Sequence, residues 1–259
     1  MNNQQQRVDG VTIVASRKES FYLSALFLAE SIRDYAPDLK LCLVVDEHLT
    51  DDRAETTFDK VIFTPYPDDY RAKLWGMSQS PWDRTLYLDA DMECVSEDIV
   101  NVFDELKDND LMFTEITDEQ RPVFKTSVFP AGKFTYNGGV CLYNSSKDRV
   151  KEFMHHWWIT YTKQFSGEWW PTDPNTGERD LVNYGPYEEM KGWDQFTLWW
   201  MTNRDPDWSD LKIGIIPDGA RYNAYTRFTS KMMNNKEPVL IHHSGSLQKD
   251  NVEVYKNGL

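Results

Sequence analysis

Short apolar runs recur along the chain, and most of them end at a polar loop. These runs are rich in valine, isoleucine and leucine at consecutive positions, which is typical of strands buried on both faces of a sheet. The predicted strands cover residues 11–15, 41–45, 61–64, 85–88, 111–114, 139–143, 212–216 and 239–241.

Between these runs, apolar residues recur at the spacing of one helix face. In residues 20–35, for example, Leu23 and Ile32 fall on the same side. Ser20 and Ser96 stand where a hydroxyl can cap the first turn of a helix. The predicted helices cover residues 20–35, 50–58, 70–80, 96–106, 146–161 and 194–201.

The alternation of strands and helices predicts the fold class. It indicates a Rossmann-like α/β domain, with a mainly parallel sheet covered by helices on both faces, over residues 1–259. Ligands of such sheets bind beyond the carboxyl ends of the strands. The loops to inspect are therefore residues 16–19, 46–47, 89–91 and 242–245.

Residues 164–191 interrupt this alternation. The segment has no clean periodicity, contains several prolines and glycines, and is rich in tryptophan and glutamate. Long irregular insertions in compact domains are usually functional. We expect a lid or an acceptor-binding insertion here, with Trp169, Trp170 and Trp193 as a stacking platform.

The amino-acid composition excludes some classes of binding partner. The 259 residues carry 28 Lys and Arg against 42 Asp and Glu, a net charge of −14, which argues against nucleic acid or an anionic membrane as partner. The ten tryptophans fit either sugar stacking or an aromatic core. No segment approaches the roughly 20 apolar residues of a transmembrane helix.

The cysteines and the N-terminal residues indicate the cellular compartment. The chain has three cysteines, too few for a disulfide framework, and two of them lie in apolar runs. Residues 1–9 are polar and Gln-rich, without the apolar core of a secretion signal. We therefore expect a cytoplasmic protein.

The sharpest chemical motif is Asp89-Ala90-Asp91 at the end of an apolar strand. Side chains alternate with period two, so the two carboxylates can point the same way and share one divalent cation. The alternative is a solvated aspartate pair at a strand–loop junction. His242 follows the last predicted strand in the same manner, and a histidine beside two carboxylates favours manganese over calcium.

A diphosphate ligand would explain why an acidic protein needs a cation there. Each phosphate charge roughly 4 Å from a carboxylate costs about 4 kcal/mol at an effective dielectric constant of about 20. A bridging divalent ion reverses that sign and stabilises a departing phosphate. The chain has neither a P-loop nor a dinucleotide-binding glycine motif.

Three further motifs can be interpreted either as ligand-binding residues or as residues with only a structural role. Asn137-Gly138 lets a ligand approach the backbone closely, or it is a plain turn. Asp194 is a ligand contact or a helix N-cap. Lys73 reaches a phosphate or sugar, or it is simply solvated.

Together, in order and spacing, these segments resemble the family 8 nucleotide-sugar glycosyltransferases. The similarity spans about residues 11–245. Its blocks are the first strand and helix, Ala72-Lys73-Leu74, Leu86-Tyr87-Leu88-Asp89-Ala90-Asp91, Tyr136-Asn137-Gly138-Gly139-Val140, Asp194-Gln195 and His242-His243-Ser244-Gly245.

The resemblance implies a GT-A fold that binds a UDP-sugar with Mn(II), or Mg(II), and transfers a hexose to a carbohydrate or other hydroxyl with retention of configuration. It implies Asp89, Asp91 and His242 as metal ligands. The other implied site residues are Lys73, Asn137, Gly138 and Asp194 around the donor sugar, Gln195 on its reacting face, Ala90 beside the metal aspartates, and Ala15, Ser16 and either Phe21 or Tyr22 around uracil.

The sequence departs from the family after Gly245. The usual Lys-Pro-Trp is replaced by Ser246-Leu247-Gln248-Lys249, where Lys249 is the candidate for the phosphate contact. Two other functions stay open: a sugar-nucleotide-binding protein without transferase activity, and a sugar-phosphate nucleotidyltransferase. A phosphatase of the haloacid dehalogenase type fits less well, because Glu93 stands where that motif needs a small hydroxyl residue.

Overall fold

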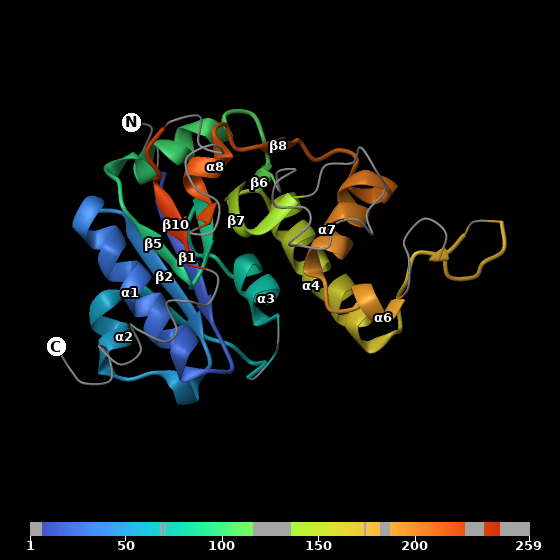
Figure 1. The fold of residues 1–259 in the computed structure, drawn as a ribbon, viewed down its shortest axis with the longest axis horizontal. Helices are drawn as coiled ribbons and strands as arrows, with labels where there is room; N and C mark the ends of the chain where they lie inside the picture. Colours follow the sequence, from blue (N-terminus) through green and yellow to red (C-terminus); the bar gives the residue numbers. More distant parts are fainter. Residues whose placement is uncertain are drawn as a thin grey trace, which may run out of the picture.

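The structure is a computed structural model, and it describes residues 7–67, 69, 71–115, 136–173, 175–181, 187–225 and 236–243. The strands within these residues form one seven-stranded and one three-stranded sheet (Figure 1). None of the helices in this part of the chain is long and apolar enough to cross a bilayer.

The large sheet has the strand order β3-β2-β1-β4-β7-β6-β8. Strand β7 runs antiparallel to both of its neighbours, and the other pairings are parallel, so the predicted mainly parallel sheet is confirmed. Its strands are β1 (Asp9–Ala15), β2 (Lys40–Val45), β3 (Lys60–Phe63), β4 (Arg84–Asp89), β6 (Leu111–Glu115), β7 (Tyr136–Asn144) and β8 (Ile213–Ile215).

Helices cover both faces of this sheet, as predicted. The alternation of side chains along β2 shows it: Leu41 and Leu43 pack in the core beneath α1 (Glu19–Tyr35), whereas Cys42 and Val44 pack in the core beneath α3 and α4. The remaining elements on the two faces are α2 (Asp52–Thr57), α3 (Ala72–Ser78), η2 (Glu97–Leu106), α4 (Asp148–Ser166), α7 (Asp194–Asn203) and α8 (Gly219–Tyr222), with short turns η1 (Glu47–Leu49) and η4 (Pro206–Trp208).

The helix ends correct two details of the prediction. The helix expected to be capped by Ser20 begins one residue earlier, at Glu19, after an uncapped Lys18. Ser96 does cap its helix by accepting a hydrogen bond from the Asp98 amide, but the element is a 3-10 helix. The three cysteines are buried and unpaired with one another.

A second sheet consists of three short strands, β5 (Met92–Cys94), β10 (Leu240–His242) and β9 (Ala224–Tyr225). The strand predicted at 239–241 belongs to it and not to the large sheet. Strand β10 pairs antiparallel with β5, with His242 opposite Met92. Since β5 follows β4 after a turn of two residues, this pairing places His242 beside the carboxyl end of β4.

The insertion predicted at 164–191 is only partly irregular. Helix α4 continues to Ser166, and the amide of Gln164, fully buried, donates to the backbone carbonyls of Met190, Lys191 and Trp193. The chain then extends outward from the body of the molecule before α6 (Tyr187–Met190) (Figure 1). Its role as a lid stays a prediction.

Helix α3, which carries Lys73, lies close against β1 and β2 because Gly76 has no side chain. A Cβ at this position would lie 2.6 Å from Val14 Cγ2 and 3.3 Å from Val44 Cβ. We expect Gly76→Val to lower the free energy of unfolding by about 1–3 kcal/mol, because the stiff side chain overpacks the helix–sheet contact.

Chemical denaturation measures this change. Lys151→Val, at an exposed position of α4, is the control for the cost of a valine in a helix. Equal stability of the two variants would contradict the close packing.

Candidate functional site

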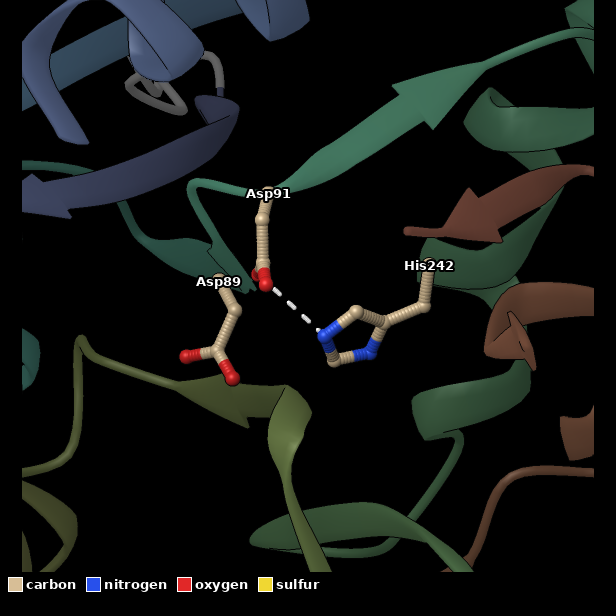
Figure 2. Close-up of side chains that lie close together, drawn as sticks. All are labelled: Asp89, Asp91 and His242. Atoms are coloured by element: carbon tan, nitrogen blue, oxygen red, sulfur yellow. Dashed lines mark ion pairs between the residues drawn. The ribbon is translucent and has the colours of Figure 1, made fainter. Parts of the chain in front are cut away.

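Asp89, Asp91 and His242 converge at the carboxyl end of β4. Asp89 is the last residue of β4, Asp91 lies in the turn to β5, and His242 ends β10. One ligand atom of each lies within 4.8 Å of the others, and His242 Nε2 is 3.2 Å from Asp91 Oδ1 (Figure 2). The pairing of β10 with β5 therefore brings together residues that are remote in the chain.

The donor set fits a divalent cation. Two carboxylates and an imidazole suit manganese, and magnesium accepts the oxygens. The neighbouring backbone leaves room at this point: a Cβ on Gly139 would lie 2.9 Å from Asp89 Oδ2 and 3.2 Å from His242 Cε1. Any side chain at position 139 would push into this group of ligands.

A hydrogen-bond chain orients the imidazole of His242. Its Nδ1 lies 2.9 Å from Asn223 Oδ1, and the Asn223 amide donates to Thr114 Oγ1 at 3.0 Å. Because the amide oxygen can only accept, Nδ1 donates to it, which makes Nε2 the nitrogen that would bind a metal. Tyr225 stacks on the ring at 4.4 Å between centroids. Sequence reasoning missed Asn223, since it precedes a strand of two residues that no periodicity reveals.

The two oxygens of Asp89 have different surroundings. Oδ1 accepts hydrogen bonds from the Tyr87 hydroxyl at 2.7 Å and from Lys73 Nζ at 3.2 Å. Oδ2 is the oxygen that faces Gly139 and His242. Burial, together with the Asp89 charge, holds the pKa of Tyr87 well above its usual value, so its hydroxyl stays a donor.

Lys73 lies between two carboxylates and is not a solvated lysine. Its Nζ is 3.2 Å from Asp89 Oδ1 and 3.3 Å from Asp194 Oδ2, and it donates to the Gly138 carbonyl at 3.4 Å. Burial by itself would lower the pKa of Lys73, but the charges of Asp194 and Asp89 outweigh it, and the pKa is raised. Lys73 is therefore a fixed positive charge.

Asp194 is not the N-cap that one interpretation of the sequence suggested. It is the first residue of α7, and its side chain is 2% exposed. Burial alone would raise the pKa of Asp194, but Lys73 and Arg71 outweigh burial and lower it, so the carboxylate is charged. Within the described residues, its buried Oδ2 accepts no hydrogen bond, although it lies 3.3 Å from Lys73 Nζ. This oxygen therefore has accepting capacity that the described residues do not use, although it is closed to solvent.

The segment Tyr136–Val140 belongs to strand β7 and is not a plain turn. The β6–β7 register shifts there: Phe113 pairs with Cys141, but Thr114 pairs with Asn137. This irregularity brings the intervening residues to the site, as bulges near active sites do. A Cβ on Gly138 would lie 3.5 Å from Asp194 Oδ2.

Asn137 itself is buried, and it shapes this backbone. Its amide donates to the Tyr225 hydroxyl at 2.9 Å, and its Oδ1 accepts from the Gly139 amide at 2.8 Å. Gln195, next to Asp194, is half-buried. Gly245 and Lys249 lie outside the described residues.

A pocket of about 360 Å³ opens beside the aspartates. Of the residues expected around uracil, Ser16 and Phe21 line it, and the Ser16 hydroxyl donates to buried Asp46. Ala15 and Tyr22 do not: both side chains are in the core, and the Tyr22 hydroxyl donates to Asp51 at 2.7 Å. The rest of the lining includes Val14, Arg17, Lys18, Asp69, Arg71, Ala72, Lys73, Tyr87, Asp89, Ala90 and Asp91.

Comparison with known proteins supports this arrangement at the level of fold. No family model matches the sequence, and no match was found among curated proteins. The galactosyltransferase LgtC, solved with donor and acceptor sugar analogues, is 18% identical, with a TM-score of 0.55 over 96% of this chain and 94% of LgtC. The chain has a GT-A fold.

Two further glycosyltransferase structures share the fold. The bifunctional WbbM is 11% identical, with a TM-score of 0.54 over 98% of this chain and 50% of WbbM. GlyE of Streptococcus pneumoniae is 14% identical, with a TM-score of 0.53 over 92% of this chain and 55% of GlyE. The resemblance that sequence motifs suggested thus extends to the tertiary structure.

The role of Asn223 can be tested with metal alone. We expect Asn223→Ala to weaken Mn(II) binding by about 10- to 100-fold, because His242 loses the acceptor that fixes its tautomer. Asn223→Asp keeps an acceptor and should retain affinity. Isothermal titration with MnCl₂ measures both, with the exposed Asn101→Ala as control. Unchanged affinity of Asn223→Ala would show that this bond does not orient the histidine.

Proposed function

We propose that this protein is a retaining, metal-dependent glycosyltransferase that moves a hexose from a UDP-sugar to an acceptor hydroxyl. The observation that carries the proposal is the convergence of Asp89, Asp91 and His242 within a GT-A fold, beside a pocket that the two aspartates line. The UDP donor, the retention of configuration and manganese rest on the resemblance of the sequence motifs to family 8.

The charges of the pocket suit a nucleoside diphosphate. Although the whole chain carries a net charge of −14, four basic residues line the pocket. They are Arg17, Lys18, Arg71 and Lys73. A cation held by Asp89, Asp91 and His242 would add Lewis-acid stabilisation of the departing phosphate. Together these groups would reverse the repulsion between the carboxylates and a diphosphate.

The buried Asp194 carboxylate suits the donor sugar. Its Oδ2 lies beside the Gly138 backbone and has accepting capacity that the described residues leave unused. A sugar hydroxyl that donates to this oxygen would be oriented by it, while Lys73 keeps the carboxylate charged. Gln195, the next residue, would lie on the reacting face.

The transfer needs no covalent enzyme intermediate. The bond between the anomeric carbon and the diphosphate oxygen breaks, and the acceptor oxygen forms a new bond on the same face. The acceptor proton goes to the departing diphosphate. The chain's contribution is to hold the two substrates and to stabilise the developing phosphate charge with groups that are already in position before the reaction.

The first test combines binding and turnover. With Mn(II) and a panel of UDP-sugars, we expect UDP release by the wild-type protein and a metal-dependent rise of its melting temperature with UDP. Asp91→Ala should lose that rise and at least about 100-fold of the rate, because a ligand of the cation is gone. Ser166→Ala, at an exposed surface position, is the control.

The other outcomes discriminate between functions. UDP binding without turnover would favour a sugar-nucleotide-binding protein. Release of pyrophosphate from a nucleoside triphosphate and a sugar phosphate would favour a nucleotidyltransferase. UDP binding that is unchanged in Asp91→Ala would contradict the assignment of the metal site.

Phe21 and Tyr22 provide a matched pair in the base pocket. We expect Phe21→Ala to weaken UDP binding by about tenfold, because an apolar pocket wall is lost. Tyr22→Phe should leave UDP affinity unchanged and lower stability by about 1 kcal/mol, because it removes only the hydrogen bond to Asp51. Calorimetric titration with UDP measures the affinity, and thermal denaturation measures the stability. If Tyr22→Phe lost UDP affinity and Phe21→Ala did not, Tyr22 and not Phe21 would be the residue that contacts the base.

A further inference from the structure

A second, larger hollow adjoins the proposed donor pocket. Its volume is about 760 Å³, and it shares Arg17, Asp69 and Arg71 with the donor pocket. The shared residues make the two hollows neighbours, so that a molecule in one lies next to a molecule in the other. We call the larger hollow the aromatic groove.

The described residues that line only the aromatic groove are uncharged: Tyr161, Thr162 and Phe165 from α4, and Gly192 and Trp193 from the segment before α7. The Phe165 side chain is 51% exposed and stacks with Tyr161, at 6.2 Å between centroids and 28° between planes. The aromatic wall is thus an apolar surface that is only partly covered. Aromatic rings with polar neighbours recognise molecules that have apolar faces and hydroxyl groups.

Polar groups stand beside this wall. The Gly192 carbonyl accepts from the Arg71 guanidinium at 3.3 Å and from the Tyr161 hydroxyl at 3.4 Å. The Thr162 hydroxyl donates to the Trp158 carbonyl at 2.9 Å, and its oxygen can still accept. These groups can exchange hydrogen bonds with a ligand's hydroxyls.

The charges in the groove lie on the side of the donor pocket. Arg71 Nε is 3.5 Å from Asp194 Oδ1, and the Arg71 amide donates to Asp69 Oδ1. The opposite side, along α4 and Trp193, presents no ionised side chain among its described lining residues. A charged ligand group on the α4 side of the groove would therefore lose its hydration without gaining an ion pair with the protein.

We propose, on the basis of the function inferred above, that the aromatic groove binds the acceptor and that this acceptor is a neutral glycan. One sugar ring stacks against Phe165 and Trp193, and its reacting hydroxyl faces the donor pocket past Arg71. A groove of this volume accommodates a ligand larger than one monosaccharide.

This placement revises the stacking platform expected from the sequence. Trp170 is 6% exposed and stacks on Phe196 at 5.0 Å between centroids, so it belongs to a small core. Trp169 packs edge-on against Trp200. Of the three expected tryptophans, Trp193 lines the groove.

The test measures binding of neutral methyl glycosides, of glucose, galactose and N-acetylglucosamine and their disaccharides, to the full chain with Mn(II) and UDP. Phe165→Ala should weaken the best-bound glycoside by about tenfold, because a stacking face is lost. Phe165→Trp should restore it. Phe63→Ala is the matched control, since Phe63 is 50% exposed and lies on β3, outside the lining.

Ligand-observed NMR gives affinities, and the UDP-induced thermal shift is recorded for each variant in parallel. Unchanged glycoside affinity in Phe165→Ala, or tighter binding of the corresponding glucuronides, overturns the groove proposal while leaving the donor site intact. Glycoside binding that depends on Phe165 in a protein without a UDP shift keeps the groove as a glycan site and removes the transferase function.

Discussion

The site depends on holding three carboxylates close together in a largely buried place. Asp89, Asp91 and Asp194 gather where the sheet ends, and water alone cannot compensate them there. Lys73 lies within 3.3 Å of two of them, and Arg71 lies 3.5 Å from Asp194. Buried charges persist only when they are paired. Asp91 approaches His242 instead, and a divalent cation bound by both would add positive charge on that side of the cluster.

Backbone features make this concentration of charge geometrically possible. The turn after β4 places Asp91 directly before β5, and the antiparallel partner of β5 delivers His242. The irregular β6–β7 register brings Gly138 and Gly139 to the same point, and the missing side chain of Gly139 leaves space for Asp89 and His242. Asn223 and Tyr225 then fix the imidazole ring. Paired strands and hydrogen bonds hold these positions, an arrangement that would need little reorganisation when a substrate binds.

The fold and the side chains of the site support the proposed function in different ways. Likeness to LgtC, WbbM and GlyE at 11–18% identity establishes the GT-A architecture. The chemistry rests on this chain's own side chains, because one fold can host many activities. The proposed donor pocket is lined by four basic residues and by the metal-ligand candidates Asp89 and Asp91, whereas the described lining residues of the aromatic groove along α4 are uncharged and mostly aromatic. This contrast matches a charged donor and a neutral acceptor in adjoining spaces.

The sequence by itself determined the main α/β alternation and the candidates Asp89, Asp91 and His242, because strand periodicity and short motifs are local properties. It left open whether Asp194 was a cap and whether Phe21 or Tyr22 faced the pocket, since burial depends on which remote elements pack against a residue. Asn223 and the strands β5 and β9 of the small sheet escaped it, because such short segments show no periodicity. Only the tertiary structure pairs β10 with β5 and opens a groove beside α4: long-range packing, not local preference, decides which side chains meet.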